Sequence, residues 1–451
     1  MKMPDLFPFQ IEAARFLASR DRAGLFDEMG LGKTVEVIGA LDLLKERRAM
    51  IICPANLREN WRAEFQRFGR TPRKVVKGRT IHDLIAWQRG RFDVLVTSYE
   101  MATKWTPKIA EHAAFIPVLV IDEAHYLKSD ATKRTKQILG DRCDGIGGLT
   151  QWALRAWMLT GTPIANDPID IYPFLKFARQ SGAPKHAWVR KYMTSQPTAF
   201  GSRQTPREET TPELRAKIQT ASMRRTKTDV GMQLPPIWLT SLVVDGDTEE
   251  IRDLLRSHPG LEDAVLQAVE QGGLSFLDAQ HVATLRRLVG TAKSLPYARM
   301  LVEELRQTDR KRVVMGIHRA VLRQVLDTLT EERIHAVLIN GETPEGQRNA
   351  SVQAFQNDPR CRVFIGQIRA AGVGLTLTAA SDVDMLESDW TPAGNAQALM
   401  RLHRIGQTRQ VEGRFITLAR SLDLVINRVV ARKVAAIASI EGDAMVASPA
   451  A

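Results

Sequence analysis

The sequence is poor in cysteine and in long hydrophobic runs, and these absences narrow the possible classes of protein. Its 451 residues include three cysteines, an odd number spread over Cys53, Cys143 and Cys361. They predict neither a disulfide framework nor a four-cysteine zinc site, so a reducing, intracellular setting is expected. No apolar run approaches the roughly 18 residues of a membrane span. The N-terminus lacks the basic and apolar segments of a secretory signal.

The composition is that of a globular chain with an excess of positive charge. Hydrophobic residues make up 44% and charged residues 25%, which excludes disorder of the whole chain. At roughly 100–200 residues per domain, two to four domains are expected. Lysine and arginine (63) exceed aspartate and glutamate (51) by 12. This excess favours a polyanionic partner but does not choose between nucleic acid and an anionic membrane surface.

Hydrophobic runs rich in β-branched residues alternate with helical patterns in the first part of the chain. The predicted strands are Ala49–Cys53, Asp93–Thr97, Pro117–Ile121 and Arg155–Thr160. The helical patterns among them are Ile11–Leu17, Val35–Leu44 and Trp61–Phe68. Strands spaced by helices predict a parallel sheet with helices on both faces.

A second series of the same kind begins near Arg312. Its predicted strands are Arg312–Ile317, His335–Ile339, Cys361–Gly366 and Asp382–Leu386, with helices at Leu322–Leu329 and Arg348–Phe355. The sequence therefore predicts an α/β fold in which two parallel-sheet domains follow one another along the chain.

The segment between the two series is basic and rich in proline. Residues 181–230 carry ten basic and four acidic side chains, a surplus of six out of the net +12. We expect a first domain over residues 1–180, a basic linker with a helical insertion over 181–295, a second domain with a C-terminal helix over 296–440, and a disordered tail over 441–451. A solvated surface insertion is the alternative to an inter-domain linker.

The segment DEMGLGKT, residues 27–34, predicts a phosphate loop because it lies between a short apolar stretch and a helical pattern. Gly30 and Gly32 allow backbone N–H groups to face a phosphate at a helix N-terminus. Lys33 is expected to pair with the β/γ-phosphates, and the Thr34 hydroxyl to bind Mg²⁺. The strict pattern has glycine where this chain has Asp27, so a chance match is the alternative.

Two further positions favour ATP hydrolysis. Asp122 and Glu123 follow an apolar run, and acidic residues after a parallel strand lie in the ligand crevice. Asp122 is expected to hold Mg²⁺, and Glu123 to orient and deprotonate the attacking water; an exposed acidic turn is the alternative. Gln10 precedes Lys33 by 23 residues (33 − 10), and its amide can pair with adenine, although a lone glutamine is usually a surface residue.

Arg401 and Arg404 are three residues apart, which places them on one face of a helix. A guanidinium is suited to a developing phosphoryl charge. We expect the second domain to supply both as arginine fingers, so that hydrolysis requires the two domains to close. Arginine pairs on helices are more often solvated or in salt bridges.

These strings, in this order, resemble helicase superfamily two and, within it, the Swi/Snf-type DNA-stimulated ATPases. DEMGLGKT is the form of the phosphate loop typical of that group, and HRIGQ at 403–407 is similar to its last motif. The resemblance covers about residues 5–415. Further segments that look like its motifs are 52–54 with 60–61, 97–100, 160–163 with Asn166, 224–227, 340–343 with Arg348, and 371–377.

Two positions depart from the common pattern of the group. Many relatives have asparagine where this chain has Thr376 and Thr391, and the first change is shared by the branch similar to annealing helicases. That branch normally carries an additional module ahead of the motor. About nine residues precede Gln10 here, so we expect a bare motor.

The resemblance implies two RecA-like lobes that use ATP and Mg²⁺ and bind double-stranded DNA, with Gly374 at the nucleotide. Seven residues are expected at the nucleic acid, where hydroxyl and N–H donors position the backbone without reading sequence: Thr97, Ser98, Arg224, Arg225, Gly341, Thr343 and Thr376. Serine and threonine also cap helices after strands, which is the alternative. We expect a monomer without membrane attachment, cytoplasmic in a bacterium, archaeon or phage and nuclear in a eukaryote.

The function expected from the sequence is an ATP-dependent translocase on double-stranded DNA that remodels or anneals DNA. A strand-separating DNA or RNA helicase is an alternative, although no wedge element is evident. A nucleotide-dependent clamp without turnover is an alternative of another class, but every catalytic residue of the motor is present. No helical His/Glu/His zinc spacing occurs, so magnesium is the only ion implied.

Overall fold

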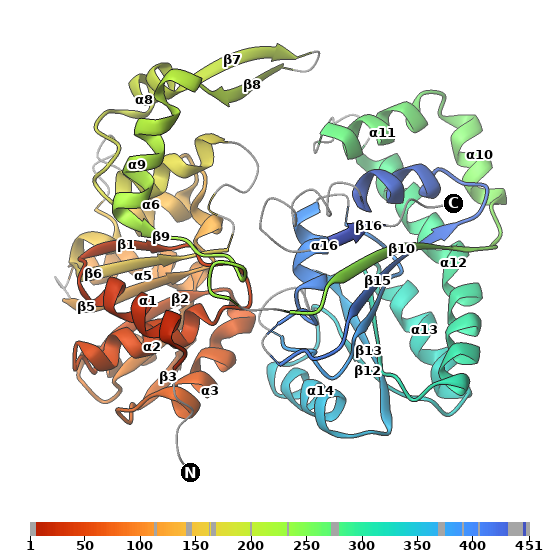
Figure 1. The fold of residues 1–451 in the computed structure, drawn as a ribbon, viewed down its shortest axis with the longest axis horizontal. Helices are drawn as coiled ribbons and strands as arrows, with labels where there is room; N and C mark the ends of the chain where they lie inside the picture. Colours follow the sequence, from red (N-terminus) through yellow and green to blue (C-terminus); the bar gives the residue numbers. More distant parts are fainter. Residues whose placement is uncertain are drawn as a thin grey trace. The chain divides into compact units, whose positions relative to one another are not determined.

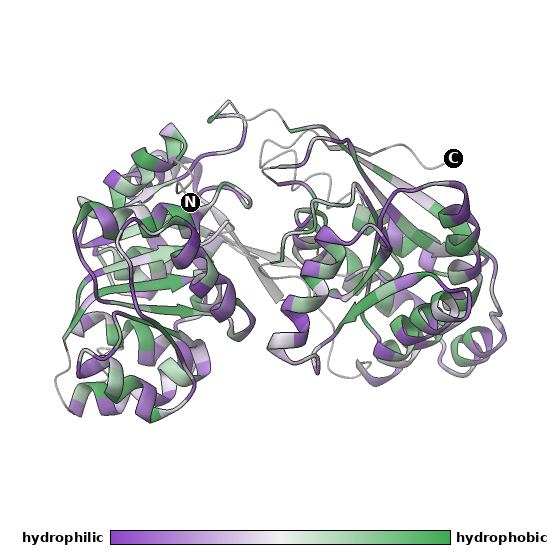
Figure 2. Ribbon diagram, turned by 90° about the horizontal axis from the view of Figure 1, so that it is seen from below, coloured by the Kyte–Doolittle hydropathy of each residue, from purple (hydrophilic) through white to green (hydrophobic). Residues whose placement is uncertain are grey.

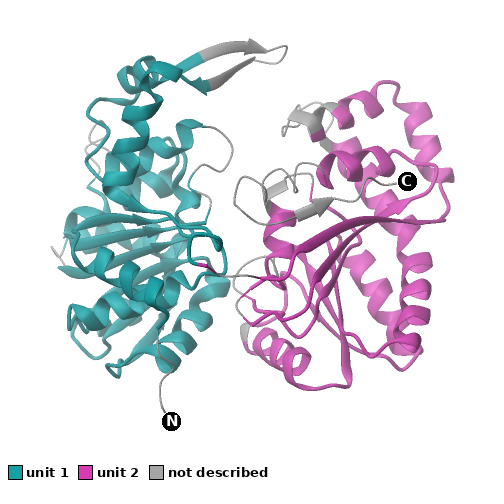
Figure 3. Cartoon of the chain, viewed as in Figure 1, with its two compact units in different colours: residues 1–230 teal, residues 231–451 magenta. Residues whose placement is uncertain are grey.

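The computed structural model divides the chain into two compact units, residues 1–230 (unit 1) and residues 231–451 (unit 2), which Figure 3 shows in different colours. Each unit is described by itself. The structure describes residues 6–111, 115–140, 147–161, 163, 168–198, 201–231, 234–271, 279–368, 375–389, 392–404, 406–431 and 445–447.

Unit 1 is built on a parallel seven-stranded sheet in the order β3-β4-β2-β5-β6-β1-β9 (Figure 1). Its strands are β1 (Arg22–Leu25), β2 (Ala49–Cys53), β3 (Val75–Gly78), β4 (Val94–Ser98), β5 (Ile116–Asp122), β6 (Ala153–Leu159) and β9 (Ser222–Met223). The strands β2, β4 and β5 are buried at every residue. A parallel sheet covered on both faces requires such unbroken apolar strands, and Figure 2 shows hydrophobic residues, in green, along strands in the interior of the molecule.

The helices of unit 1 lie between these strands in the chain. They are α1 (Pro8–Ala18), α2 (Lys33–Leu43), α3 (Arg58–Phe68), α4 (Ile81–Gln88), α5 (Tyr99–Glu111), α6 (Lys133–Leu139), α7 (Tyr172–Phe177), α8 (Lys185–Tyr192) and α9 (Thr211–Ala221). Short 3-10 turns lie at Ala55–Leu57, Ala124–Leu127, Leu149–Trp152, Pro168–Ile171 and Glu208–Thr210. The antiparallel hairpin of β7 (Met193–Thr198) and β8 (Gly201–Pro206) forms a separate two-stranded sheet.

Unit 2 repeats the parallel architecture in the order β12-β13-β11-β14-β15-β10-β16. Its strands are β10 (Ile237–Val244), β11 (Arg312–Gly316), β12 (His335–Ile339), β13 (Cys361–Gln367), β14 (Asp382–Met385), β15 (Val411–Leu418) and β16 (Met445–Ala447). Its helices are α10 (Glu249–Ser257), α11 (Leu261–Gln271), α12 (Ala279–Gln307), α13 (Arg319–Glu331), α14 (Glu345–Asn357) and α16 (Pro392–Leu399).

The sheet of unit 2 has a core on each face. Along β11, Val313 and Met315 belong to one hydrophobic cluster, whereas Val314 between them belongs to another. Because successive side chains of a strand point to opposite faces, the two clusters cover the two sides of the sheet. Both units therefore confirm the predicted α/β class with two parallel-sheet lobes.

The segment expected as a linker and insertion does not form a third unit. Residues 181–230 belong to unit 1, where they form α8, the β7–β8 hairpin, α9 and the edge strand β9. Residues 231–295 belong to unit 2 and include the expected helices α10 and α11. The expected boundary at 295/296 falls inside α12, whose 29 residues continue through Gly290 and Pro296.

Two other findings concern the C-terminal tail and membrane spans. Met445–Ala447, within the tail expected to be disordered, form β16, which pairs with β10 at Ile237–Leu239. In the ranges that the structure describes, no helix is long and apolar enough to cross a membrane.

Candidate active site

The phosphate loop connects β1 to α2 and contains two glycines in the left-handed region. Gly30 has φ 94° and Gly32 has φ 93°, backbone conformations that favour glycine. Gly32 also caps α2, and a Cβ atom there would lie 2.6 Å from the Gln10 side-chain nitrogen. The loop thus ends at a helix N-terminus, where free N–H groups and the helix dipole favour an anion.

Lys33 and Thr34 are the first two residues of α2. The Lys33 ammonium donates to the carbonyl oxygens of Asp27 and Glu28, the latter at 3.1 Å. Its charge therefore lies across the loop to which it belongs. The hydroxyl of Thr34 lies in the first turn of the same helix, and the assignment of both residues to a nucleotide stays a prediction.

Gln10 is a buried residue that bridges α1 and the phosphate loop. Its Oε1 accepts from the Phe7 N–H at 3.1 Å, and its Nε2 donates to the Leu31 carbonyl oxygen at 3.0 Å. These contacts differ from the surface position usual for a lone glutamine. An amide nitrogen has a second hydrogen and the oxygen a second lone pair, so adenine recognition by Gln10 stays a prediction.

Asp122 lies at the C-terminal end of β5 and is buried among hydrogen-bond donors. Trp61 Nε1 donates to its Oδ2 at 2.8 Å, and the Glu123 N–H donates to its Oδ1 at 2.9 Å. Burial and then the negative charge of Glu123 raise the pKa of Asp122 to about 7, whereas Lys33 acts in the opposite direction. Leu25 and Asp122 are both in register with Leu159 of β6, so the phosphate loop and the end of β5 lie at one edge of the parallel sheet.

Glu123 adopts a left-handed backbone conformation, with φ 54° and ψ 49°. A residue with a side chain costs about 1–2 kcal/mol there, and such strain is concentrated at functional sites. Its Oε2 lies 3.3 Å from His125 Nδ1, which also hydrogen-bonds with Thr160 Oγ1 at 3.3 Å. Tyr99 OH donates to the Asp122 carbonyl oxygen at 2.6 Å and fixes this turn from α5.

The donor set fits magnesium better than a metal held by protein ligands alone. Within the described ranges, no group of three His, Cys, Asp or Glu side chains could hold a metal ion. Magnesium usually takes one or two carboxylates and completes its shell with waters and substrate phosphates. Asp122 with the Thr34 hydroxyl is such a sparse set.

Two residues expected at nucleic acid are instead used inside unit 1. Thr97 is fully buried, and its hydroxyl donates to the Gly78 carbonyl oxygen at 3.1 Å. Ser98 is 5% exposed, and its hydroxyl accepts from the Met101 N–H at 3.3 Å in the first turn of α5. Both hydroxyls therefore make hydrogen bonds within unit 1, that of Ser98 at the start of a helix, and their expected contact with nucleic acid stays a prediction.

The neighbouring arginines 224 and 225 have different surroundings. Arg224 is exposed, so its assignment to nucleic acid stays a prediction. The Arg225 side chain is 12% exposed and forms ion pairs with Asp27 and Glu36. Its guanidinium is thus engaged beside the phosphate loop, and its expected contact with nucleic acid stays a prediction.

Arg401 and Arg404 do not lie on a helix, contrary to the expectation from their spacing. The helix α16 ends at Leu399, and the two arginines occupy the turns that follow. Arg401 is buried in unit 2. Arg404 Nη1 donates to the Leu375 carbonyl oxygen at 3.1 Å and to Thr376 Oγ1 at 3.2 Å.

The other residues of unit 2 that were expected at nucleic acid lie in or beside short turns. The Gly341 N–H donates to Gln367 Oε1 at 3.0 Å, and Thr343 Oγ1 accepts from the Asn340 N–H at 2.9 Å. Thr376 is exposed beside Arg404. Their roles at nucleic acid stay predictions, and Gly374 lies outside the described residues.

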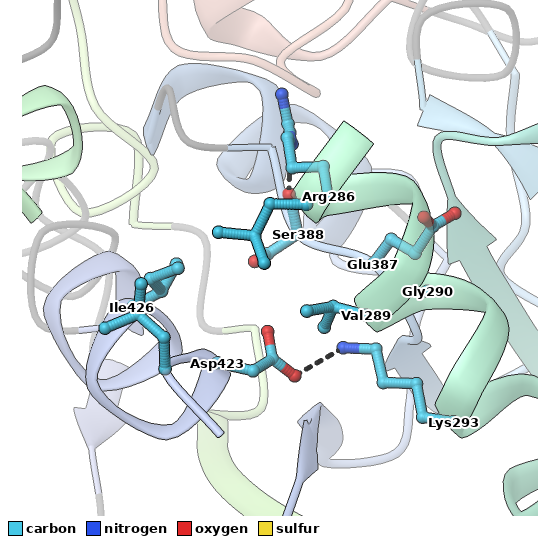
Figure 4. A pocket seen from close by; sticks show the side chains of 10 residues that line it. Arg286, Val289, Gly290, Lys293, Glu387, Ser388, Asp423 and Ile426 are labelled. Carbon is cyan, nitrogen blue, oxygen red and sulfur yellow. Dashed lines mark hydrogen bonds and ion pairs between the residues drawn. The ribbon is translucent and has the colours of Figure 1, made fainter. Parts of the chain in front are cut away.

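A small pocket in unit 2 is not a second nucleotide site. It lies between α12 and the residues after β14 and β15, and Figure 4 shows Lys293 paired with Asp423 at 2.7 Å on its wall. Its volume is about 30 Å³, enough for a water molecule or two. Sites for small ligands are typically roughly 300–1,000 Å³.

Trp61 and Tyr99 lie in segments that resemble family motifs, but neither they nor His125 was expected to have a role. Trp61 donates a hydrogen bond to the Asp122 carboxylate, and Tyr99 donates one to the Asp122 carbonyl oxygen. His125 contacts both Glu123 and Thr160. The available signal was a polar aromatic residue inside each motif, since a buried indole or phenol requires a hydrogen-bond partner.

Two protein-family models match the chain. The model described as SNF2-related domain matches residues 9–252, and the one described as Helicase conserved C-terminal domain matches residues 297–406. The first match spans more than half of the chain. These matches confirm the resemblance inferred from the motifs.

Similar proteins are longer than this chain. The SWI/SNF-related matrix-associated actin-dependent regulator of chromatin subfamily A-like protein 1 of Drosophila melanogaster is 28% identical over 434 residues, 93% of this chain and 54% of that protein. The DNA annealing helicase and endonuclease ZRANB3 of Homo sapiens is 28% identical over 445 residues, 95% of this chain and 40% of that protein. The chain thus spans about half, or less, of the length of these curated relatives.

One solved structure is also similar over nearly all of the chain. It is that of the Sulfolobus solfataricus SWI2/SNF2 ATPase core in complex with dsDNA, which is 21% identical, with a TM-score of 0.46. The match covers 98% of this chain and 94% of that one.

Proposed function

The chain belongs to the SNF2-related family, and from this premise we propose that it is an ATP-dependent motor that moves along double-stranded DNA. The observation that carries the proposal is the site of unit 1, where the phosphate loop after β1 and the buried Asp122–Glu123 turn after β5 lie at the same edge of the sheet. The relative named as a DNA annealing helicase supports DNA as the polymer. The net charge of +12 also suits a polyanion.

The cofactors proposed are ATP and Mg²⁺. The loop from Gly30 to Thr34 offers N–H groups, an ammonium and a hydroxyl to phosphates, and Asp122 offers a carboxylate to the ion. Bound Mg²⁺ supplies charge neutralisation at the transferred phosphoryl group. Glu123 orients the attacking water and accepts its proton, and the hydrogen bonds of Asp122, Tyr99 and His125 hold that turn in position.

Arg401 and Arg404 are proposed to stabilise the charge that develops during phosphoryl transfer. Support comes from the sequence motif and from the suitability of guanidinium for that charge. Arg404 hydrogen-bonds with Thr376, a proposed nucleic-acid contact. A change at Thr376 can therefore reach Arg404 directly, which gives unit 2 a local link between nucleic acid and catalysis.

Among the proposed nucleic-acid contacts, Arg224 lies in unit 1, and Gly341, Thr343 and Thr376 lie in unit 2. Arg224 and Thr376 are exposed, and the turn from Asn340 to Thr343 is held by its own hydrogen bonds. Such groups position a phosphate backbone without reading its sequence. A motor that must move along any sequence requires contacts of this kind.

Displacement of a third DNA strand tests the proposal, because a translocase removes that strand without opening the duplex. With ATP, the chain is expected to release the third strand from a triplex, and Lys33→Ala is expected to release none. Lys74→Ala, which alters a lysine in the same unit away from the phosphate loop, serves as the matched control and is expected to act like the wild type. Absence of ATP-dependent release would contradict translocation.

A strand-separating helicase is the second candidate because unit 1 contains a hairpin of the kind that can act as a wedge. The hairpin β7–β8 forms a sheet of its own, whereas the residues described within 246–290 lie mostly in helices. A tailed duplex beside the triplex separates the two candidates. Unwinding of the tailed duplex without triplex release would favour the helicase.

A further inference from the structure

The last segment of unit 1 lies along the entry to the phosphate loop. The edge strand β9 pairs with β1, and hydrogen bonds continue past the paired residues. The Phe26 N–H donates to the Met223 carbonyl oxygen at 2.7 Å, and the Glu28 N–H to the Arg225 carbonyl oxygen at 2.9 Å. We name residues 222–227 the clamp segment. Its last residue, Lys227, lies four residues before Gly231, the first residue of unit 2.

Arg225 of the clamp segment holds the first residue of the phosphate-loop motif. Its guanidinium forms an ion pair with both carboxylate oxygens of the fully buried Asp27, and its backbone N–H donates to Asp27 Oδ1 at 2.9 Å. The same guanidinium donates to the Phe9 carbonyl oxygen at 2.6 Å and lies 3.2 Å from Glu36 Oε1. Arg225 therefore joins α1, α2 and the loop between them.

Lys227 holds the second residue of the motif in the same way. Its ammonium lies 2.5 Å from Glu28 Oε1, and its backbone N–H donates to Glu28 Oε2 at 2.7 Å. Both side chains are 4% exposed. Two consecutive acidic residues are thus each paired, side chain and backbone, with a cation about 200 residues later in the sequence.

The arrangement matters because acidic residues are unfavourable where a polyphosphate binds. Asp27, Glu28 and Glu36 place three buried carboxylates around the loop. Lys33 donates to the carbonyl oxygens of Asp27 and Glu28, so the position of its ammonium depends on those two residues. Without the two cations of the clamp segment, the carboxylates would repel an anionic ligand and would themselves be buried charges without compensation.

We propose that Arg225 and Lys227 are positioning residues of the nucleotide site, which neutralise and orient Asp27 and Glu28 so that the loop accepts a triphosphate. The inference rests on the proposed function, since it assumes that ATP binds this loop. It explains why this phosphate loop has aspartate where the strict pattern has glycine. It also ties the loop to the stretch of chain that enters unit 2.

A double-mutant cycle on the full chain tests the inference through the dissociation constant of a fluorescent ATP analogue with Mg²⁺. Arg225→Gln is expected to weaken binding at least about ten-fold, because it leaves Asp27 as an uncompensated anion beside the phosphates. Asp27→Asn combined with Arg225→Gln is expected to return binding to within about three-fold of the wild type, because the stranded charge is gone.

If the Arg225–Asp27 ion pair is purely structural, the double variant is not expected to bind the ATP analogue more tightly than Arg225→Gln. Both variants lose the same pair, so the double variant would bind as weakly as Arg225→Gln, or more weakly; that order, or unchanged binding in Arg225→Gln, overturns the inference. Arg215→Ala, exposed on α9, is the matched control and is expected to bind like the wild type.

Two further measurements distinguish failure of the inference from misfolding of a variant and from failure of the proposed function. If Arg225→Gln does not fold, Lys227→Gln with and without Glu28→Gln forms an independent cycle with the same expected order. If Lys33→Ala binds the analogue as tightly as the wild type, the proposed nucleotide site itself fails. If Lys33→Ala loses binding while Arg225→Gln does not, only the inference about the clamp segment fails.

Discussion

Replacement of Glu123 by glutamine is expected to lower DNA-stimulated ATP turnover by about a hundred-fold to ten-thousand-fold while ATP still binds. Glutamine keeps the shape of the side chain but cannot accept a proton from water, and a positioned general base contributes roughly that factor. Turnover at saturating ATP and the dissociation constant of an ATP analogue are measured on the same preparation. Glu100→Gln, an exposed glutamate of the same unit, is the matched control.

The same assay separates the roles proposed for Lys33 and Arg404. Lys33→Ala is expected to lose both binding and turnover, because the ammonium holds the phosphates in the ground state. Arg404→Ala is expected to lose turnover with binding largely kept, and Arg420→Ala, an exposed arginine of unit 2, to lose neither. Full turnover in Glu123→Gln, Lys33→Ala or Arg404→Ala would contradict the role assigned to that residue.

Replacement of Asp384 by asparagine is expected to destabilise unit 2 by about 3–5 kcal/mol. Asp384 is fully buried on β14. Its carboxylate accepts hydrogen bonds from Arg414 Nε at 2.7 Å, from Arg414 Nη2 at 2.8 Å and from the Tyr297 hydroxyl at 2.6 Å. Arg312 lies 3.3 Å from the same carboxylate. Asparagine would leave the guanidinium groups of Arg312 and Arg414 paired with Glu304 but without the charge of Asp384, and Tm for unit 2 is expected to fall by roughly 10 °C.

The control for Asp384→Asn is Asp245→Asn, whose ion pair with Arg420 is exposed on both sides, with 83% of the Asp245 side chain and 80% of the Arg420 side chain accessible to solvent. Exposed pairs contribute about 0–1 kcal/mol, so a small change is expected. Burial alone would raise the pKa of Asp384, but Arg414 and Arg312 hold that pKa below its ordinary value. Its contribution to stability is therefore present above the pKa of an unfolded aspartate and is lost as pH falls through the lowered value. Equal Tm losses in the two variants would contradict this account.

The central strands could be predicted because burial on both faces requires an unbroken apolar run. The strands β2 and β12 have the predicted bounds, and β4, β5 and β6 differ from prediction by one or two residues. The edge of each sheet was harder to predict. The strand β10 alternates between buried and exposed residues and follows two prolines, which obscured it in the sequence.

Elements whose residues are explained by distant partners could not be predicted. The strand β15 contains Arg414, a residue untypical of a buried strand, because Asp384 lies beside it. The helix α12 contains Gly290, a usual helix-breaking signal, because a Cβ there would lie 2.3 Å from Glu387 Oε1. Such pairings depend on the folded structure and leave no local pattern.

In the candidate site, too, features set by local sequence could be predicted, and features set by distant partners could not. Local motifs predicted Lys33, Asp122 and Glu123, because a loop between a strand and a helix and an acidic strand end carry their chemistry in a few adjacent residues. Arg225 was expected at nucleic acid because residues 224–227 resemble a motif of the family. Its actual partner, Asp27, is 198 residues away in the sequence, so composition could not reveal it.

The rate of ATP turnover by the wild-type chain, measured with and without nucleic acid, tests the central claim most directly. The claim is that this chain hydrolyses ATP in response to double-stranded DNA. Duplex DNA is expected to raise the rate strongly, and more than single-stranded DNA or RNA does. A rate that no nucleic acid raises would contradict the account.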